Sequence, residues 1–397
     1  MPAPDSPAAP APTVLTGPLL AALIATQLGL HSAMAGLRMA APLAALREGW
    51  SAWAVGVLMS LFAVAPVMLA LRAGRMADKH GFHRPVKWAA GFAFVGMGVA
   101  LVATTLSGAA QFTALCIAAM LTGAGTNVGL IAIQRTAGQA AMDSVQRMRV
   151  FSWLGMAPSM SNVIGPVLTG LAIDAAGFRA AFVLLWLMPL LSLVAARRVP
   201  RSPASPRPPA GGTAWDLLRR PGLKRLLGVN LLLSACWDVH TFAVPVLGHD
   251  FGFSASTIGL ILGAFTLSVT GVRLLIPIVA HRMREVIVLR AAMIGTGVIF
   301  AAYPFASAPW AMGLLAFGLG ATLGSVQPMI MSGLHHMTPA ARHGEAIALR
   351  SIVINLSSSV LPLVFGAAGA AVGVAALFWG VGGATVAGSW PARHLRF

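Results

Sequence analysis

The sequence predicts an all-α integral membrane protein, in which twelve transmembrane helices form two pseudosymmetric six-helix bundles. Hydrophobic residues make up 57% of the 397 residues, and the mean hydropathy is +0.82. This composition leaves too little polar surface to cover a soluble globule. Apolar stretches of about 20 residues, long enough to cross a hydrocarbon core of roughly 30 Å, recur along the chain. A weak internal repeat relates the two halves.

The apolar stretches are helical, because the strands of a membrane barrel would alternate at much shorter spacing. The first thirteen residues lack a basic segment typical of cleavable signals, so we expect a cytoplasmic tail at 1–13 and a retained first span. The predicted spans lie at about 14–42, 52–72, 86–106, 109–134, 148–173, 178–196, 224–248, 254–279, 285–305, 308–333, 345–371 and 373–390.

The one break in the apolar pattern is the proline-rich, basic stretch 197–222. Its composition is typical of an extended linker. We therefore expect an N-terminal bundle at 14–196, a cytoplasmic linker at 197–222 and a C-terminal bundle at 223–397, with a short interfacial helix near the end of the linker.

The internal repeat supports this division. "WSAWAVGVL" at 50–58 aligns with "FSASTIGLI" at 253–261, and "GAGTNVG" at 123–129 aligns with "GLGATLG" at 318–324. Repeats of this kind are typical of transporters that bind substrate between their halves. The glycines lie in the middle of spans, where small residues allow close helix packing, so we interpret them as packing sites and not as a nucleotide fingerprint.

The net charge of +17 is distributed unevenly along the chain. Of the 27 Lys and Arg residues, only Arg38, Arg47 and Arg179 lie in or beside the odd-numbered connections between spans. Basic residues concentrate on the cytoplasmic side of membrane proteins, so both termini are predicted to be cytoplasmic. This placement favours topology and the lipid bilayer over nucleic acid as the reason for the basic charge.

A charged motif lies between the second and third spans, in "GRMADKHGFHRP" at 74–85. It resembles the signature of the major facilitator superfamily, and the twelve-span pattern is most similar to its drug:proton antiporter branch. The resemblance implies a cytoplasmic gate that latches the two halves when the cavity opens outward, with topology anchoring as the alternative. We expect Gly81 to adopt positive φ and Gly74 to permit close helix contact. The gate residues are Gly74, Asp78, Lys79, Gly81 and Arg84.

A second motif lies in the fifth span, in "SNVIGPVLTG" at 161–170. Gly165, Pro166 and Gly170 match the antiporter motif of the same family, whereas Ser161 and Thr169 replace glycines. The resemblance implies an exporter, and an ordinary kinked packing helix is the alternative. The arginine that the family carries in its fourth span is Ala119 here, so proton handling does not follow from that motif.

Polar groups inside apolar spans are costly, so each is a candidate site residue. Asp238 is the one carboxylate clearly inside a span, and burial disfavours its charged form, so we predict that it carries the coupled proton. Pairing with Arg38 across a central cavity and a purely structural polar network both remain open. The candidates for the substrate cavity are Gln27, His31, Arg38, Asn127, Asn230, Trp237, His240, Gln327 and Asn355.

The sequence contains no zinc-peptidase, nucleotide-binding or CxxC motif, which argues against an enzyme, a metal site or a cofactor. The predicted function is proton-coupled efflux of small amphipathic organic compounds by a monomeric secondary transporter. The alternatives are import of an anionic metabolite or siderophore-like compound and, more remotely, a non-transporting receptor. Arg outnumbers Lys by 24 to 3, as in GC-rich bacterial genomes, so we expect the bacterial inner membrane.

The topology can be tested by cysteine labelling in a variant that lacks Cys116 and Cys236. A cysteine at Ser205, in the linker, should react with an impermeant maleimide in inverted vesicles and stay unlabelled in intact cells. A control cysteine at Ser107, in an odd-numbered connection, should show the reverse. Labelling of the linker cysteine in intact cells would contradict the topology.

Overall fold

The computed structural model describes residues 16–140, 144–201, 214–219, 221–279, 284–338 and 343–395, and the regular secondary structure in these ranges is helical. Each of the twelve predicted spans corresponds to helix. The elements are α1 (Gly17–Arg47), α2 (Ala52–His80), α3 (His83–Ala103), α4 (Gly108–Ala140), α5 (Ser144–Ala196), η1 (Ala214–Arg219), α6 (Pro221–Asp250), α7 (Ala255–Val279), α8 (Glu285–Ala302), η3 (Tyr303–Phe305), α9 (Pro309–Gly324), α10 (Val326–Met337), α11 (His343–Val372) and α12 (Val374–Ala392).

The helix boundaries differ from the predicted spans at two points. The fifth and sixth spans both lie in α5, where the backbone leaves helical geometry at Ala176 and turns through Gly177, whose φ is +78°. The tenth span is divided into α9 and α10 at Ser325. Ten segments of the described chain are long and apolar enough to cross a membrane, and one of them, Trp153–Ala196, covers two predicted spans.

Local sequence explains where the first helices begin and end. The side chains of Thr16 and Ser51 accept hydrogen bonds from the backbone N–H groups of Leu19 and Ala54 at the starts of α1 and α2, each at 3.4 Å. Gly81 ends α2 with φ +67° and donates its N–H to Ala77 O at 2.9 Å. The predicted positive φ of Gly81 is therefore confirmed.

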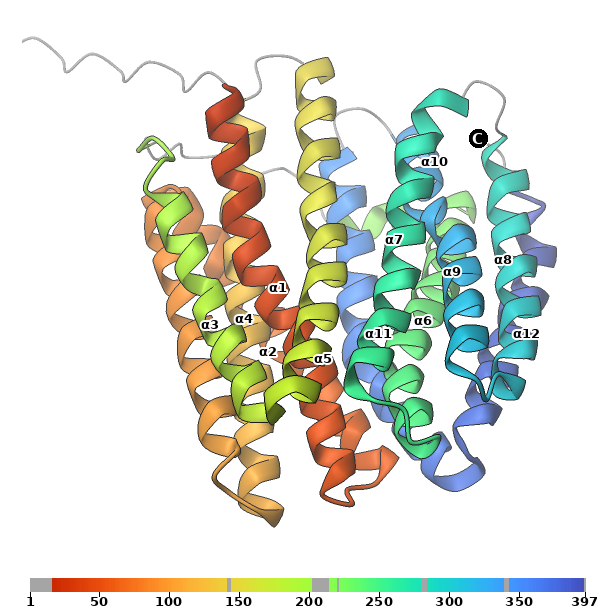
Figure 1. Cartoon of the computed structure of the whole chain (residues 1–397). Coiled ribbons are helices and arrows are strands. Elements are labelled where there is room, and N and C mark those ends of the chain that lie inside the picture. Colours follow the sequence, from red (N-terminus) through yellow and green to blue (C-terminus); the bar gives the residue numbers. More distant parts are fainter. Residues whose placement is uncertain are drawn as a thin grey trace, which may run out of the picture.

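The helices form two bundles that lie side by side, with α1 to α5 on one side of Figure 1 and α6 to α12 on the other. Two helix pairs join the bundles: α5 packs on α7, and α2 packs on α11. The repeated glycines pack helices within a bundle. A methyl group at Gly123 or Gly125 would overlap the backbone carbonyl oxygen of Phe62 in α2 or Ala89 in α3. This contact confirms the packing interpretation of "GAGTNVG".

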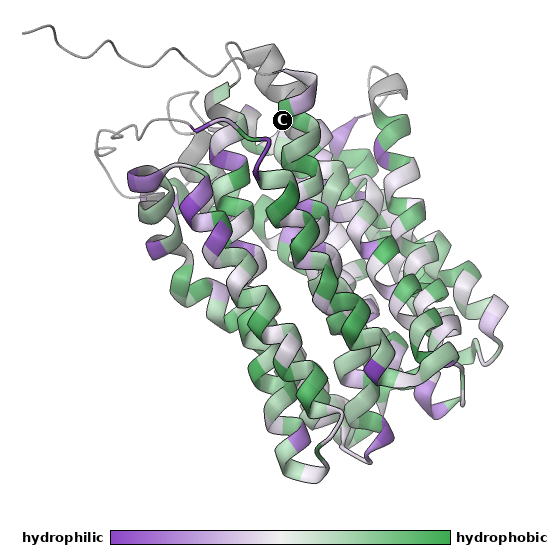
Figure 2. Cartoon of the chain, turned by 60° about the vertical axis from the view of Figure 1, so that its left-hand side comes forward, coloured by the Kyte–Doolittle hydropathy of each residue, from purple (hydrophilic) through white to green (hydrophobic). Residues whose placement is uncertain are grey.

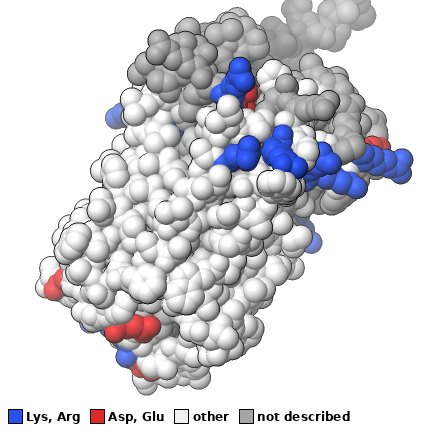
Figure 3. All heavy atoms as spheres, turned by 90° about the vertical axis from the view of Figure 1, so that its right-hand side faces the viewer, with Lys and Arg blue, Asp and Glu red and all other residues white. Residues whose placement is uncertain are grey.

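The two ends of the molecule differ in charge. On the face drawn in Figure 3, Lys and Arg gather toward one end and acidic side chains appear at the other. Figure 2 shows hydrophobic residues along the helices between these ends. We call the end that carries Lys79 and Arg84 the basic end, and the end that carries Glu48, Asp174 and Asp250 the opposite end.

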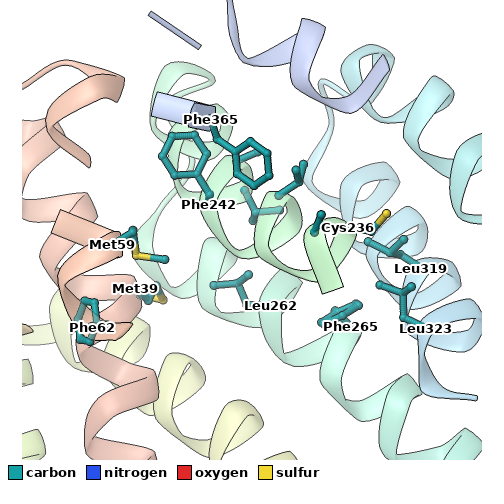
Figure 4. Close-up of a cluster of buried hydrophobic side chains, with 14 of the residues drawn as sticks. Met39, Met59, Phe62, Cys236, Phe242, Leu262, Phe265, Leu319, Leu323 and Phe365 are labelled. Carbon is teal, nitrogen blue, oxygen red and sulfur yellow. The ribbon is translucent and has the colours of Figure 1, made fainter. Parts of the chain in front are cut away.

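The two bundles are in close contact toward the opposite end. A methyl group at Gly56 of α2 would overlap the carbonyl oxygen of Pro362 in α11, and one at Gly170 of α5 would overlap that of Ala255 in α7. Buried apolar side chains fill the space between these contacts. In Figure 4, Met59 and Phe62 of α2 lie with Leu262 of α7 in one cluster, which belongs to the continuous core of the two bundles.

Three glycines toward the basic end make no such contact. A methyl group at Gly74 of α2, Gly155 of α5 or Gly271 of α7 would meet no atom within 4 Å. The close helix contact that the gate motif predicted at Gly74 is therefore not made in this conformation. The close backbone contacts between the bundles lie toward the opposite end, and in this sense we call it the closed end.

Asp174 joins the two bundles at the opposite end. Its carboxylate accepts the backbone N–H of Ala255 on one oxygen, at 3.0 Å, and the N–H of Ser256 on the other, at 2.7 Å. These donors are the first residues of α7, whose N–H groups have no partner within the helix. Asp174 of the N-terminal bundle therefore caps the start of a helix of the C-terminal bundle and links the two bundles at this end.

We expect Asp174→Ala to shift the protein toward a state that is open at the opposite end. Loss of a helix cap costs about 0.5–2 kcal/mol, which corresponds to a change of roughly 2- to 30-fold in the equilibrium. The readout is the rate at which a maleimide labels Met59→Cys in purified protein that lacks Cys116 and Cys236. Met59 is only 2% exposed, so a cysteine at this position should react only when the opposite end opens.

Asp250→Ala is the matched control. It removes an exposed carboxylate from the same end of the molecule and leaves the cap of α7 intact. Its labelling rate should equal that of the parent protein, whereas Asp174→Ala should label faster. Equal rates in both variants would show that Asp174 does not hold this end closed.

Candidate functional site

Two opposite charges from different bundles face each other inside the protein. Arg38 lies in the last third of α1, and Asp238 lies beyond the middle of α6, so both are nearer the opposite end than the basic end. Their charges attract one another across the boundary between the bundles. Asp238 is 6% exposed, so this attraction acts in surroundings that contain little water.

The carboxylate of Asp238 has a defined partner. Ser358 of α11 donates its hydroxyl to Asp238 Oδ2 at 3.1 Å. The guanidinium of Arg38 is less satisfied, because its buried Nε has no hydrogen-bond partner and its Cζ lies 5.9 Å from the centre of the Phe62 ring. An unpartnered buried donor is costly, so Arg38 can bind an anion or a closer carboxylate.

The two histidine candidates differ in their surroundings. His31 lies on α1 with its buried Nδ1 unpartnered, and its ring is close enough to Arg38 for their charges to interact. His240 lies on the other side of α6 from the central pair. Its Nδ1 is 3.3 Å from the Tyr303 hydroxyl, and its ring centre is 4.4 Å from that of Phe265. The structure therefore brings His31 to the central pair and His240 into the core of the C-terminal bundle.

The remaining candidates are spread along the bundle. The side-chain oxygens of Gln27 and Asn127 are buried without partners, in α1 and α4 of the N-terminal bundle. Trp237 packs edge-on against Phe265, with ring centres 4.5 Å apart. Asn355 is half-buried on α11, one turn before Ser358. Asn230 and Gln327 bind arginines that the sequence analysis did not select.

These arginines are Arg273 of α7 and Arg350 of α11. Arg273 donates to Ser159 Oγ and to Gln327 Oε1, each at 3.0 Å. Arg350 donates its Nε to Asn230 Oδ1 at 3.1 Å. The missed signal is the stretch "SVTGVRLLIPIV" at 268–279, where Arg273 has apolar residues on both sides.

The gate motif lies at the basic end. Lys79 and Arg84 are exposed, and Gly81 forms the turn between α2 and α3. The backbone of Asp78 belongs to α2, but its side chain lies outside the described part of the structure. The predicted latch role of this carboxylate stays a prediction.

The antiporter-type motif lies where α5 meets two other helices. A methyl group at Gly165 would overlap the backbone of Ser32 and Gly36 in α1. Pro166 and Gly170 face the other bundle, because the Pro166 carbonyl closely approaches Gly259 and Gly170 packs on Ala255. The motif is therefore part of the contact between bundles at the closed end.

Across the described ranges, no group of three or more His, Cys, Asp or Glu side chains is arranged to hold a metal ion. The chemistry that the site offers is charge pairing, hydrogen bonding and proton exchange at a buried carboxylate. The central pair of Arg38 and Asp238 lies between the two helical bundles.

Comparison with known proteins identifies the family. The family model of the Major Facilitator Superfamily matches residues 13–237 and again 226–395. A search of curated proteins gives no match.

Solved transporters share the fold. A peptide transporter of the POT family is 13% identical with a TM-score of 0.75, covering 94% of this chain and 93% of its own. A POT family transporter in complex with 5-aminolevulinic acid is 12% identical with a TM-score of 0.74, covering 94% of each chain. The nucleoside transporter NupG is 16% identical with a TM-score of 0.71, covering 96% of this chain and 99% of its own.

The fold, the central charges and the family match lead to the same conclusion. The chain belongs to the Major Facilitator Superfamily and is a membrane transporter, not an enzyme.

Proposed function

We propose that this protein is a proton-coupled secondary transporter that exports small amphipathic organic compounds by alternating access. Asp238 is the proposed proton-carrying group. The observation that carries the proposal is the buried Asp238 carboxylate, which accepts the Ser358 hydroxyl and lies close to the Arg38 guanidinium of the other bundle. A charge pair that spans the two moving parts can link protonation to their relative position.

Asp238 is suited to this role by its location. Other carboxylates of the described chain lie at helix ends or in short segments between helices, where they do not reach the interior: Glu48, Asp174, Asp216, Asp250 and Glu285. Ser358 donates to Oδ2 of Asp238, so this hydroxyl holds the carboxylate in place while a proton binds. Protonation removes the charge that attracts Arg38 and so weakens the link between α1 and α6.

The alternating-access cycle follows from the contacts between the bundles. In the present conformation the α2–α11 and α5–α7 pairs are closed toward the opposite end. Rocking of the bundles about the central site would separate these contacts and bring the basic ends together. Gly74 and the charged residues that follow it would then form the closed gate that the family resemblance implies.

The placement in the cell belongs to the same proposal. Basic residues favour the cytoplasmic side, so the basic end and both termini are proposed to face the cytoplasm of a bacterial inner membrane. The open end of this conformation would then receive a compound from inside the cell. We propose that the protein acts as a monomer, because each chain carries both bundles.

Export is supported by the antiporter-type motif, whose Gly165 packs on α1 and whose Gly170 packs on α7. The motif therefore lies at a contact that must open and close during transport. The similar structures with named ligands or substrates concern peptides, nucleosides and 5-aminolevulinic acid. These names support an organic solute of small size.

The second candidate function is proton-coupled import of an anionic compound. Arg273 and Arg350 favour this candidate, because they place two partly buried positive charges beside the boundary between the bundles. The two candidates predict opposite directions of net movement under the same proton gradient. One reconstituted system can therefore distinguish them.

The test begins with a panel of amphipathic compounds, applied to cells that lack their own efflux pumps, to find one whose accumulation depends on this protein. That compound is then followed in proteoliposomes under an imposed pH difference of one unit. Under 1:1 exchange, wild type should concentrate it about tenfold toward the more acidic compartment. Accumulation toward the alkaline compartment, along with the protons, would overturn export and favour import.

Asp238→Asn should abolish this accumulation while leaving exchange down a concentration gradient intact, because the amide cannot carry the proton. The accumulation ratio should fall to about one. Asp250→Asn is the control, since Asp250 is an exposed carboxylate at the end of the same helix. If Asp238→Asn concentrates the compound as well as wild type does, Asp238 is structural and another group couples the proton.

A further inference from the structure

Arg273 and Arg350, which we call the arginine pair, form a second charged cluster apart from the central charges. The pair draws on both bundles, because Arg273 of α7 donates to Ser159 of α5 and Arg350 of α11 donates to Asn230 of α6. The two guanidinium groups are close enough for their positive charges to repel one another. Such a juxtaposition is unfavourable unless an opposite charge compensates it.

No carboxylate of the described residues forms an ion pair with either guanidinium. The hydrogen-bond acceptors of the pair are neutral: the Ser159 hydroxyl and the amide oxygens of Gln327 and Asn230. Asp238 lies eight residues beyond Asn230 on α6, a separation of about 12 Å along the helix. Interior cations are usually paired with anions, and among the described residues the cluster has no anionic partner.

The cluster also contains donors without acceptors. Arg273 Nε and Asn230 Nδ2 are both buried and have no hydrogen-bond partner. Both atoms can only donate. A ligand that satisfies them must supply lone pairs, and one that also offsets the repulsion within the pair must be negatively charged.

The structure provides space beside the pair. Gly155 lies one turn before Ser159 on α5, and Gly271 lies two residues before Arg273 on α7. A methyl group at either glycine would meet no atom within 4 Å. The backbone next to the cluster is therefore not closely packed at these two positions.

We propose that the arginine pair, with Asn230 and Gln327, binds the anionic group of the transported compound, a carboxylate or a phosphate. A guanidinium presents parallel donors that match the two oxygens of such a group, and these charge-assisted hydrogen bonds are short and strong. This inference rests on the proposed function in one respect, that an organic compound passes between the bundles. It names the substrate class as an organic anion and does not depend on the direction of transport.

The distance between the two charged clusters fits an amphipathic anion. The arginine pair holds the charged group nearer the basic end, and the central pair of Arg38 and Asp238 lies about 12 Å farther along α6. Trp237 and Phe265 pack together near this deeper level. An apolar body attached to the anionic group would reach toward these rings.

The test measures binding to the purified full-length protein in a neutral detergent, with no proton gradient. The probes are benzoate and phenyl phosphate, with benzylammonium and benzyl alcohol as a cation and a neutral compound of similar size. We expect the two anions to raise the unfolding temperature and the two controls to leave it unchanged. No binding of either anion, or equal binding of benzylammonium, would overturn the proposal.

The variants Arg273→Gln and Arg350→Gln should each weaken benzoate binding by about tenfold or more, since each loses charged hydrogen bonds. Arg273→Lys keeps the charge without the planar fork and should bind with intermediate affinity, which also reports on the site if the glutamine variant fails to fold. Arg393→Gln is the control, an exposed arginine near the chain end. Benzoate binding at wild-type strength in folded Arg273 and Arg350 variants would refute the assignment.

Two further measurements distinguish substrate binding by the arginine pair from lipid binding and from proton coupling. Phosphatidylglycerol added to the detergent should not compete with benzoate, and displacement by the lipid would assign the pair to a phospholipid headgroup and overturn the proposal. Asp238→Asn should retain benzoate binding. Benzoate binding by a wild-type protein that shows no proton-coupled accumulation would contradict only the proposed proton coupling, whereas coupled transport without anion binding would contradict only the substrate class.

Discussion

The interior of a lipid bilayer solvates neither an unpaired backbone group nor a charge, and the structure of this protein depends on that constraint. Backbone N–H and C=O groups that cross the hydrocarbon must find partners within the chain, which selects helices. Charged side chains must likewise turn away from lipid toward the space between helices. The same constraint therefore produces the helical fold and collects the charged residues between the two bundles.

Contact between the bundles is controlled by small residues, because lipid tails provide no hydrophobic drive for helices to associate. Toward the opposite end, Gly56 and Gly170 allow the backbone of one bundle to approach that of the other. Asp174 adds a directional interaction by capping α7 from the N-terminal bundle. Interactions of this kind are local and individually modest, so they can break and re-form during a transport cycle.

The charged groups in the interior lie at two levels with different properties. At the deeper level, Asp238 and Arg38 carry opposite charges and lie close together across the bundle boundary. At the level nearer the basic end, Arg273 and Arg350 repel one another and leave donors unsatisfied. These two levels suit complementary tasks in a transporter. The carboxylate can bind the coupled proton, and the cationic cluster can bind the anionic group of the transported compound.

The sequence by itself determined the membrane class, the number of spans, the family resemblance and the turn at Gly81, because these depend on composition, segment length and residues close together in the chain. It also selected Asp238 and Arg38, since a lone charge within an apolar stretch is visible in one dimension.

Only the tertiary structure decided which end is closed, that Asp174 caps a helix some 80 residues away in the chain, and that Gly74 makes no contact in this conformation. It also decided that Arg273 and Arg350 lie close together. Each of these facts depends on the rotation of a helix about its axis and on the relative position of the two bundles, and a helix that is apolar on nearly all sides leaves no periodic signal from which either could be read.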